Sequence, residues 1–271
     1  MSDAKPTNPA GALERLLHIM VRLRDPDGGC PWDVQQTMQS LTRYTLEEAY
    51  EAVDAIERNA PDEIKDELGD LLFQIVFYAQ IGAEQELFDF TDIANAISDK
   101  MVRRHPHVFA AAQTHESQLD KQWEAIKATE QGDTPNALLD SIPVGLPALM
   151  YAQKIQKKCA RVGFDWPGVA PVLDKVREEI EEIQAELDAE ERDQAALEAE
   201  IGDAFFALVN LARHCQVDAD AALRRASQKF SGRFGQVEIL ATSMYGGLEG
   251  RDLAELEALW QQVKASEINQ P

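Results

Sequence analysis

The chain has 271 residues, enough for one large domain or two modest ones, and 45% of them are apolar, as in a globular protein. Its formal net charge of −22 argues against a general polyanion binder, because nucleic-acid binding needs a basic face, so we expect no nucleic-acid polymer as a partner. No apolar stretch approaches the ~18 residues of a membrane span, so we expect no membrane association.

The N-terminus, Met1 to Gly11, is polar and has no apolar leader segment. Three cysteines, Cys30, Cys159 and Cys215, lie far apart in the chain. An odd number of cysteines without close spacing is typical of a reducing compartment. We therefore expect a cytoplasmic protein.

The acidic charge is concentrated in two segments. Glu47 to Asp70 has a net charge of −8 and Glu178 to Asp203 a net charge of −11, which together make up nearly all of the −22. The excess is therefore two local features, and each needs its own explanation.

The predicted elements are helical throughout. In chain order, apolar residues recur at helical spacing from Leu13 to Met20, from Ala49 to Ile56 and from Leu68 to Ala79. Clustered Gly and Pro predict a loop at 25–31 and a connector between two halves at 131–136 and 142–147. No convincing period-two strand pattern occurs, so the sequence predicts an all-α fold.

The two halves repeat five sequence features in the same order, which indicates a tandem duplication of a helical-bundle domain. We predict an N-terminal domain at 12–130, a linker region at 131–147 and a C-terminal domain at 148–268. The repeated features are an aromatic loop (Cys30–Asp33; Val162–Trp166), Glu-Glu-x-x-Glu (from Glu47; from Glu178), Glu-x-Gly-Asp (Glu67–Asp70; Glu200–Asp203), a basic pair (Lys100 and Arg104; Lys229 and Arg233) and Trp-x-x-x-Lys (Trp123 and Lys127; Trp260 and Lys264).

The C-terminal Glu-Glu-x-x-Glu motif places three carboxylates in one sector of a helix. Glu178 and Glu182 are four residues apart and Glu179 and Glu182 three apart, at about 100° per residue. Like charges at these spacings destabilise an isolated helix, and no basic residue follows Glu178 until Arg192. Taken alone, this motif is also compatible with a solvated acidic face.

The next helix favours a metal site over a solvated face. Glu200, Asp203, Asn210 and His214 fall on one stripe of a segment that is otherwise strongly apolar. A largely buried helix that keeps carboxylates must pair them or supply a cation. Carboxylates without thiolates suit Mg²⁺, or Mn²⁺, better than Zn²⁺, and such ions usually hold substrate phosphates.

Basic and aromatic residues supply the other side of a phosphate site. Lys175 is three residues before Glu178, and Lys229 and Arg233 are four apart on a later helix. Cations near a metal cluster are tolerable when a polyphosphate lies between them. An exposed basic face remains the alternative for Lys229 and Arg233, and Trp260 either stacks on a nucleobase or packs in the core.

These motifs resemble those of the MazG family of nucleoside triphosphate pyrophosphohydrolases, over about residues 12–268. The resemblance rests on the loop Gly29–Asp33, on Gln36-Thr37 and Ser40-Leu41, and on the two sets of acidic motifs. Met38 departs from the family, which typically has His after Gln-Thr, but that loop is not a metal motif.

The resemblance implies an all-α nucleoside triphosphate pyrophosphatase fold and Mg²⁺-dependent hydrolysis of NTPs and dNTPs to the monophosphate and pyrophosphate. It also implies a homodimer with the site built between helices. It assigns metal and nucleotide binding to the C-terminal residues Lys175, Glu179, Glu182, Glu200, Asp203, Lys229, Arg233 and Trp260. One cluster carboxylate would serve as general base, and Glu178 is our candidate.

The halves differ at matching positions, which predicts that the C-terminal site is the main catalyst. Lys175 corresponds to Tyr44, and Asn210, a further candidate for nucleotide binding, corresponds to Phe77. The N-terminal half is then a weaker, regulatory or structural copy. Its candidate metal ligands are Glu47, Glu48, Glu51, Glu67 and Asp70.

Two other functions remain open at this point. A nucleotide-binding regulator without catalysis would keep the same residues, and a helical scaffold would use the acidic residues as solvated faces. The sequence encodes no base preference.

Overall fold

The computed structural model describes residues 6–110, 126 and 138–268 of the chain. These residues form eleven helices and no strand, which confirms the all-α prediction. The chain divides into two compact units, Met1–Asp133 and Thr134–Pro271. The division falls within the predicted connector, although residues 131–136 and the predicted Trp123–Lys127 pair lie outside the described residues.

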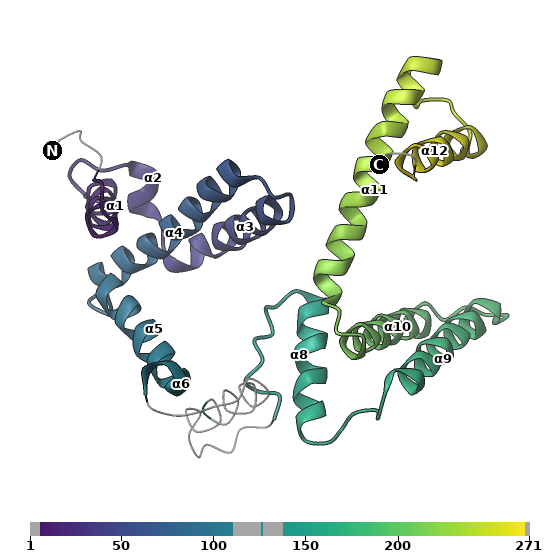
Figure 1. Ribbon diagram of the computed structural model, residues 1–271, viewed down its shortest axis with the longest axis horizontal. Coiled ribbons are helices and arrows are strands. Elements are labelled where there is room, and N and C mark those ends of the chain that lie inside the picture. The colour runs from purple at the N-terminus through teal and green to yellow at the C-terminus, as the bar shows by residue number, and fades with distance from the viewer. Residues whose placement is uncertain (1–5, 111–125, 127–137, 269–271) are drawn as a thin grey trace. The chain divides into compact units, whose positions relative to one another are not determined.

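The N-terminal unit is built on an antiparallel helix pair (Figure 1). Its helices are α1 (Pro9–Leu23), α2 (Pro31–Gln35), α3 (Met38–Glu57), α4 (Pro61–Glu84), α5 (Phe90–Arg104) and α6 (Pro106–Phe109). α3 packs along α4, and α1 also packs against α4. Met20, Leu41, Val76, Phe77 and Ile81 form the buried core between these helices.

Local sequence signals fix where α3 and α4 begin. The Thr37 hydroxyl accepts a hydrogen bond from the Ser40 amide, while the Ser40 hydroxyl accepts one from the Thr37 amide. This capping box satisfies two amides that the first turn of α3 leaves unpaired. Pro61 begins α4 at a position where its missing amide hydrogen costs nothing.

A buried arginine holds α2 and its loop against the end of α4. The Arg24 side chain is only 7% exposed and forms a bidentate ion pair with Glu84, with its closest N–O distance at 2.6 Å. It also donates to the backbone oxygens of Asp33, at 2.5 Å, and Gln36, at 3.2 Å. The loop that carries Trp32 is therefore fixed by charge-assisted hydrogen bonds rather than by a large apolar core.

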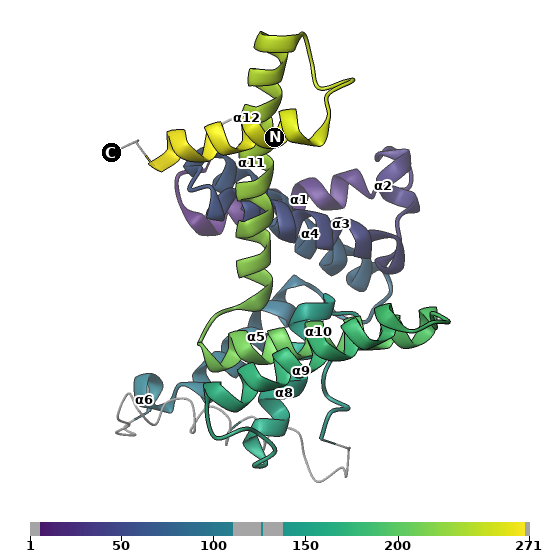
Figure 2. The ribbon, with the colours of Figure 1, turned by 90° about the vertical axis from the view of Figure 1, so that its right-hand side faces the viewer.

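The C-terminal unit repeats the helix pair and adds a long hairpin. Its helices are α8 (Ala148–Arg161), α9 (Val169–Asp188), α10 (Gln194–His214), α11 (Ala219–Tyr245) and α12 (Leu253–Ile268). α9 packs along α10, with α8 against α10, whereas α12 packs on the C-terminal half of α11 (Figure 2). A left-handed Gly246, with φ of 83°, ends α11.

α10 is less buried than its sequence suggests. Ala204, Ala207, Val209 and Asn210 are buried, but Phe205 is 59% exposed, and Ile201, Phe206 and Leu208 are also exposed. The apolar residues of α10 thus lie partly on the surface of the single chain. In the part of the chain that the structure describes, no helix combines the length and hydropathy needed to cross a bilayer.

An ion-pair network fixes the loop before α9 to the end of α10. Arg213 Nη1 donates to Asp165 Oδ2 at 2.9 Å, and His214 Nε2 lies 2.9 Å from Asp165 Oδ1. The hydrogen bonds from Arg213, followed by those from His214, lower the pKa of Asp165 to about 2. Since the unfolded carboxyl has a pKa near 3.9, Asp165 stabilises the fold above about pH 4, and this stabilisation is lost as the pH falls towards 2.

We therefore expect Asp165→Asn to lower the free energy of unfolding at pH 7 by about 1–2 kcal/mol. Partial exposure of Asp165 to water makes this loss smaller than the pKa shift alone would give. The difference from the unsubstituted protein should shrink steadily as the pH falls from 4 to 2. Urea unfolding at a series of pH values measures it. Asp174→Asn, which removes an exposed partner of Arg177, serves as control. A difference that stays constant down to pH 2 would contradict this account.

Candidate metal centres

Three carboxylates from α9 and α10 meet in the C-terminal unit. Glu179, Glu182 and Glu200 each offer an oxygen, and these oxygens lie within 4.8 Å of one another. Glu179 is only 4% exposed, which is rare for a carboxylate. The paired helices thus create a focus of negative charge from residues on both sides of the hairpin.

Lys175 lies at the edge of this cluster. Its Nζ is 2.7 Å from Glu179 Oε1 and 2.9 Å from Glu178 Oε1. Hydrogen bonds to Glu179, and next to Glu178, raise the pKa of Lys175 well above its usual value. Lys175 therefore stays charged and partly neutralises the buried Glu179, while Glu178 remains exposed.

The remaining charge of the cluster is unfavourable. Burial raises the pKa of Glu182, and the nearby Glu179 and Glu200 raise it further, against the opposing charge of Lys175. A divalent cation would relieve this repulsion, and a donor set of carboxylate oxygens fits Mg²⁺ or Mn²⁺. Asp203 lies one helical turn beyond Glu200 and is exposed, outside the group of three.

The N-terminal unit has a matching cluster on α3 and α4. Oxygens of Glu48, Glu67 and Asp70 lie within 4.8 Å of one another. Burial, followed by the charge of Asp70, raises the pKa of Glu48, and burial followed by the charge of Glu51 raises that of Glu67. The other two predicted ligands, Glu47 and Glu51, are exposed and lie outside the group of three.

The predicted phosphate-binding cations lie elsewhere in the C-terminal unit. Arg233, on α11, forms an ion pair with Glu267 on α12 at 2.6 Å. Trp260 packs against Phe230, with ring centroids 5.1 Å apart, and Arg233 lies 5.9 Å from the Trp260 centroid. Lys229 is exposed on α11. Within one chain, these three residues belong to the α11–α12 hairpin, whereas the carboxylates lie between α9 and α10.

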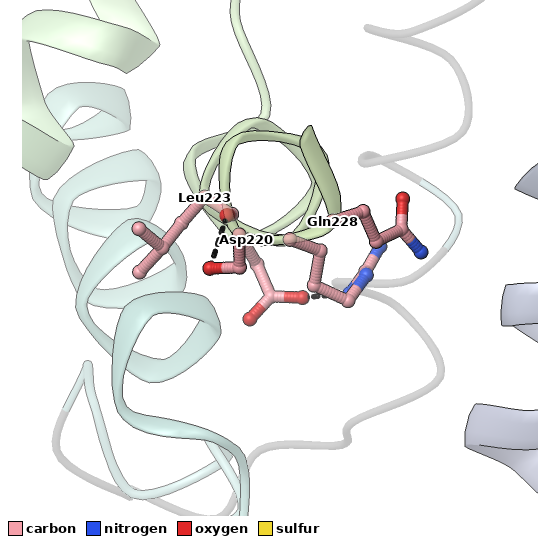
Figure 3. Close-up of a pocket in the computed structure, with 5 residues that line it drawn as sticks. Asp220, Leu223 and Gln228 are labelled. Atoms are coloured by element: carbon pink, nitrogen blue, oxygen red, sulfur yellow. Dashed lines mark hydrogen bonds and ion pairs between the residues drawn. The ribbon is translucent and has the colours of Figure 1, made fainter. Parts of the chain in front are cut away.

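α11 also has a hollow that is separate from the predicted phosphate-binding residues. Asp220 and Arg224 form an ion pair there, one turn apart, and the Ser227 hydroxyl donates to the Leu223 backbone oxygen (Figure 3). With Gln228, these residues line the hollow along one face of the helix. Neither Lys229 nor Arg233 lines it.

Asn210 belongs to the Asp165 network. Its Oδ1 accepts hydrogen bonds from Arg213 Nε at 3.0 Å and Nη2 at 2.7 Å. His214, on the same predicted stripe, contacts Asp165. Of the predicted stripe, Asn210 and His214 therefore order the loop before α9, and Glu200 belongs to the carboxylate cluster.

Gln74, on α4, is a buried polar residue near the N-terminal cluster that the motifs did not predict. Gln74 is 7% exposed, and its buried Oε1 has no hydrogen-bond partner among the described residues. It lies one turn after Asp70, on the carboxylate face of the helix. A single amide within the apolar run Leu71–Phe77 was the available signal.

The described residues thus form two all-α units, each with carboxylates gathered between a pair of helices, which defines a class of tandem helical proteins with one acidic cluster per unit. The family model of the MazG nucleotide pyrophosphohydrolase domain matches residues 36–109 and 170–237, which include both clusters. The chain belongs to the MazG family.

Several relatives match most of the chain. It is 52% identical over 259 residues to the nucleoside triphosphate pyrophosphohydrolase of Escherichia coli (strain K12), covering 95% of this chain and 98% of the relative. A Thermotoga maritima protein named nucleoside triphosphate pyrophosphohydrolase/pyrophosphatase MazG is 40% identical over the same shares. The nucleoside triphosphate pyrophosphohydrolase of Mycobacterium tuberculosis is 36% identical over 56% of this chain and 46% of the relative.

Proposed function

We propose that this chain is a Mg²⁺-dependent nucleoside triphosphate pyrophosphohydrolase that converts NTPs and dNTPs to the monophosphate and pyrophosphate. The observation that carries the proposal is the cluster of Glu179, Glu182 and Glu200 inside a region matched by the MazG domain. The names of the relatives from E. coli and T. maritima support the same activity.

In this proposal, Glu179, Glu182 and Glu200 would hold the metal, and Asp203, one turn beyond Glu200 on α10, would complete the donor set. An ion held there would supply positive charge for the phosphate oxygens and would make a water molecule more acidic. Mn²⁺ is an alternative ion, because the donors are all carboxylate oxygens.

Lys175 and Glu178, on the same part of α9, also have roles in the proposed reaction. Lys175 carries a permanent positive charge beside Glu179 and stabilises the charge that develops on a phosphate. Glu178 is exposed and next to the buried ligand in sequence, so its carboxylate can accept a proton from the attacking water. Tyr44 takes the place of Lys175 in the N-terminal unit, which favours the C-terminal cluster as the main catalyst.

We also propose a cytoplasmic homodimer. The proposal rests on the exposed apolar residues of α10, Ile201, Phe205, Phe206 and Leu208, because large exposed apolar patches are typical of interaction surfaces. A second copy would cover this face and bring another α11–α12 hairpin, with Lys229, Arg233 and Trp260, within reach of the carboxylates. Light scattering should then report twice the 30.2 kDa chain mass.

Product analysis tests the activity. The protein is incubated with each NTP and dNTP in the presence of Mg²⁺, and monophosphate is separated from diphosphate. We expect monophosphate and pyrophosphate in equal amounts. A diphosphate product would indicate a γ-phosphatase and overturn the proposal.

Product analysis, together with nucleotide binding and thermal melting in Mg²⁺, separates the two other functions. Saturable, Mg²⁺-dependent nucleotide binding without product would indicate a regulator. A helical scaffold would give no product, and its melting temperature would not change with Mg²⁺, whereas ion binding to the native state must raise it by mass action.

A further inference from the structure

A hollow of about 370 Å³ lies where α2 meets the start of α3. We propose that it is the nucleobase pocket of a nucleotide site in the N-terminal unit, with the triphosphate at Glu48, Glu67 and Asp70. The inference rests on the proposed function for the metal assignment of that cluster. Its lining residues are Trp32, Gln36, Gln39, Ser40, Thr42, Arg43 and Tyr44.

The aromatic groups of the hollow are available to a ligand. Trp32 is 48% exposed, so the fold does not use its indole as a core residue. Its ring is edge-on to Tyr44, with centroids 5.8 Å apart and an interplanar angle of 72°. An exposed indole face next to a second ring is a sequence-tolerant platform for stacking a nucleobase.

A cation adds to this platform. The Arg43 guanidinium lies 4.4 Å from the centroid of the Tyr44 ring and donates a hydrogen bond to its hydroxyl. Among the described residues, Arg43 contacts Tyr44 and forms no ion pair with a carboxylate. Arginine planes and glutamine amides, here Arg43 and Gln39, contact both the face and the edge of a base.

The platform is held rigidly. Arg24 fixes the Asp33 backbone oxygen within the short helix α2 and the Gln36 backbone oxygen directly after it. The Gln36 side chain donates to the Trp32 backbone oxygen at 3.0 Å and accepts from the Ser40 hydroxyl at 2.7 Å. Pre-ordering of this kind reduces the entropy that a ligand would lose on binding.

The hollow is one helical turn from the carboxylate cluster. Tyr44 lines the hollow and precedes Glu48 by four residues on α3, about 6 Å along the axis. On α4, Gln74 follows Asp70 by four residues and keeps its buried Oε1 without a partner among the described residues. Thr45 and Tyr78 share a hydrogen bond of 2.7 Å across the pair.

This polar seam is particular to the N-terminal unit. At the positions that correspond to Thr45, Gln74 and Tyr78, the C-terminal unit has Val176, Ala207 and Leu211. Leaving a buried amide oxygen unpaired costs free energy, at Gln74 as at Gln156 of the C-terminal unit, and a ligand at the seam would relieve that cost at Gln74. In the proposed site, this seam connects the triphosphate-binding cluster with the base pocket.

The test measures binding to the full chain with the C-terminal cluster disabled by Glu179→Gln and Glu200→Gln. Calorimetry in Mg²⁺ compares α,β-methylene-ATP, which resists cleavage between the α- and β-phosphates, with inorganic triphosphate, which lacks a base. We expect one nucleotide per chain. Trp32→Ala should weaken the nucleotide at least 10-fold and change inorganic triphosphate affinity less than twofold, because stacking acts on the base alone.

Two further variants control the test. Trp32→Phe keeps an aromatic face and should restore most of the affinity, which a folding defect would not allow. Phe164→Ala removes the exposed aromatic residue of the corresponding C-terminal loop and should have no effect. Glu48→Gln should weaken both ligands.

Either of two results would overturn the inference: no nucleotide bound to the disabled protein, or Trp32→Ala within twofold of its parent. If the unsubstituted chain releases pyrophosphate while either result is found, the proposed function stands without this site. If Trp32-dependent binding occurs but no pyrophosphate is released, the pocket stands and the activity fails.

Discussion

Glu179→Gln should reduce pyrophosphate release from dNTPs roughly 100-fold or more. Glutamine has nearly the same shape as glutamate but lacks the negative charge. The substitution therefore weakens the contact with Lys175 and also removes a carboxylate oxygen donor from the C-terminal cluster. The measurement is the initial rate of pyrophosphate release in Mg²⁺.

Glu48→Gln is the matched control for this prediction. Glu48 occupies the corresponding position in the N-terminal cluster, and the substitution is chemically identical. We expect it to leave most of the turnover intact, because Tyr44 replaces the cation that Lys175 supplies. If Glu48→Gln alone abolishes turnover, the N-terminal unit is the catalyst and the assignment is reversed.

Arg24→Met should lower the free energy of unfolding of the N-terminal unit by about 3 kcal/mol. Methionine fills part of the same volume but removes the charge that pairs with Glu84 and both hydrogen bonds to the α2 backbone. Breaking a buried ion pair from one side is costly because the remaining polar groups lose their partners. Urea unfolding followed by circular dichroism measures the change.

Arg58→Met is the control. Arg58 also pairs with two carboxylates, Asp54 and Glu63, but its side chain is 46% exposed. Water replaces those partners, so stability should remain nearly unchanged. An equal loss in both variants would show that burial of Arg24 is not the cause.

The helical period predicted which carboxylates of one helix share a face, but not which carboxylates of two helices meet. Residues three and four apart share a face, so Glu179 with Glu182, and Glu67 with Asp70, were placed together correctly from their spacing. Duplication of both motifs predicted that each unit would contain one cluster. The all-α fold followed from the same periodicity, since each apolar stripe matched one helix.

Contacts between helices that are distant in sequence were not predictable. Lys229, Arg233 and Trp260 have a plausible spacing for phosphate and base, yet the structure pairs Arg233 with Glu267 and packs Trp260 on Phe230. Lys175, interpreted as facing phosphate, contacts Glu178 and Glu179. Periodicity gives the direction of a side chain on its own helix but not the partner it meets.

The concentration of −19 of the −22 net charge in two segments, their helical faces and the repeated order of motifs were all determined by the sequence. Only the tertiary structure decided that Glu179 is buried, that Arg24 holds α2 through hydrogen bonds, and that Trp32 is half-exposed next to Tyr44. The physical reason is that helix register is a local property of the chain, whereas burial and pairing depend on which surfaces the packed helices cover.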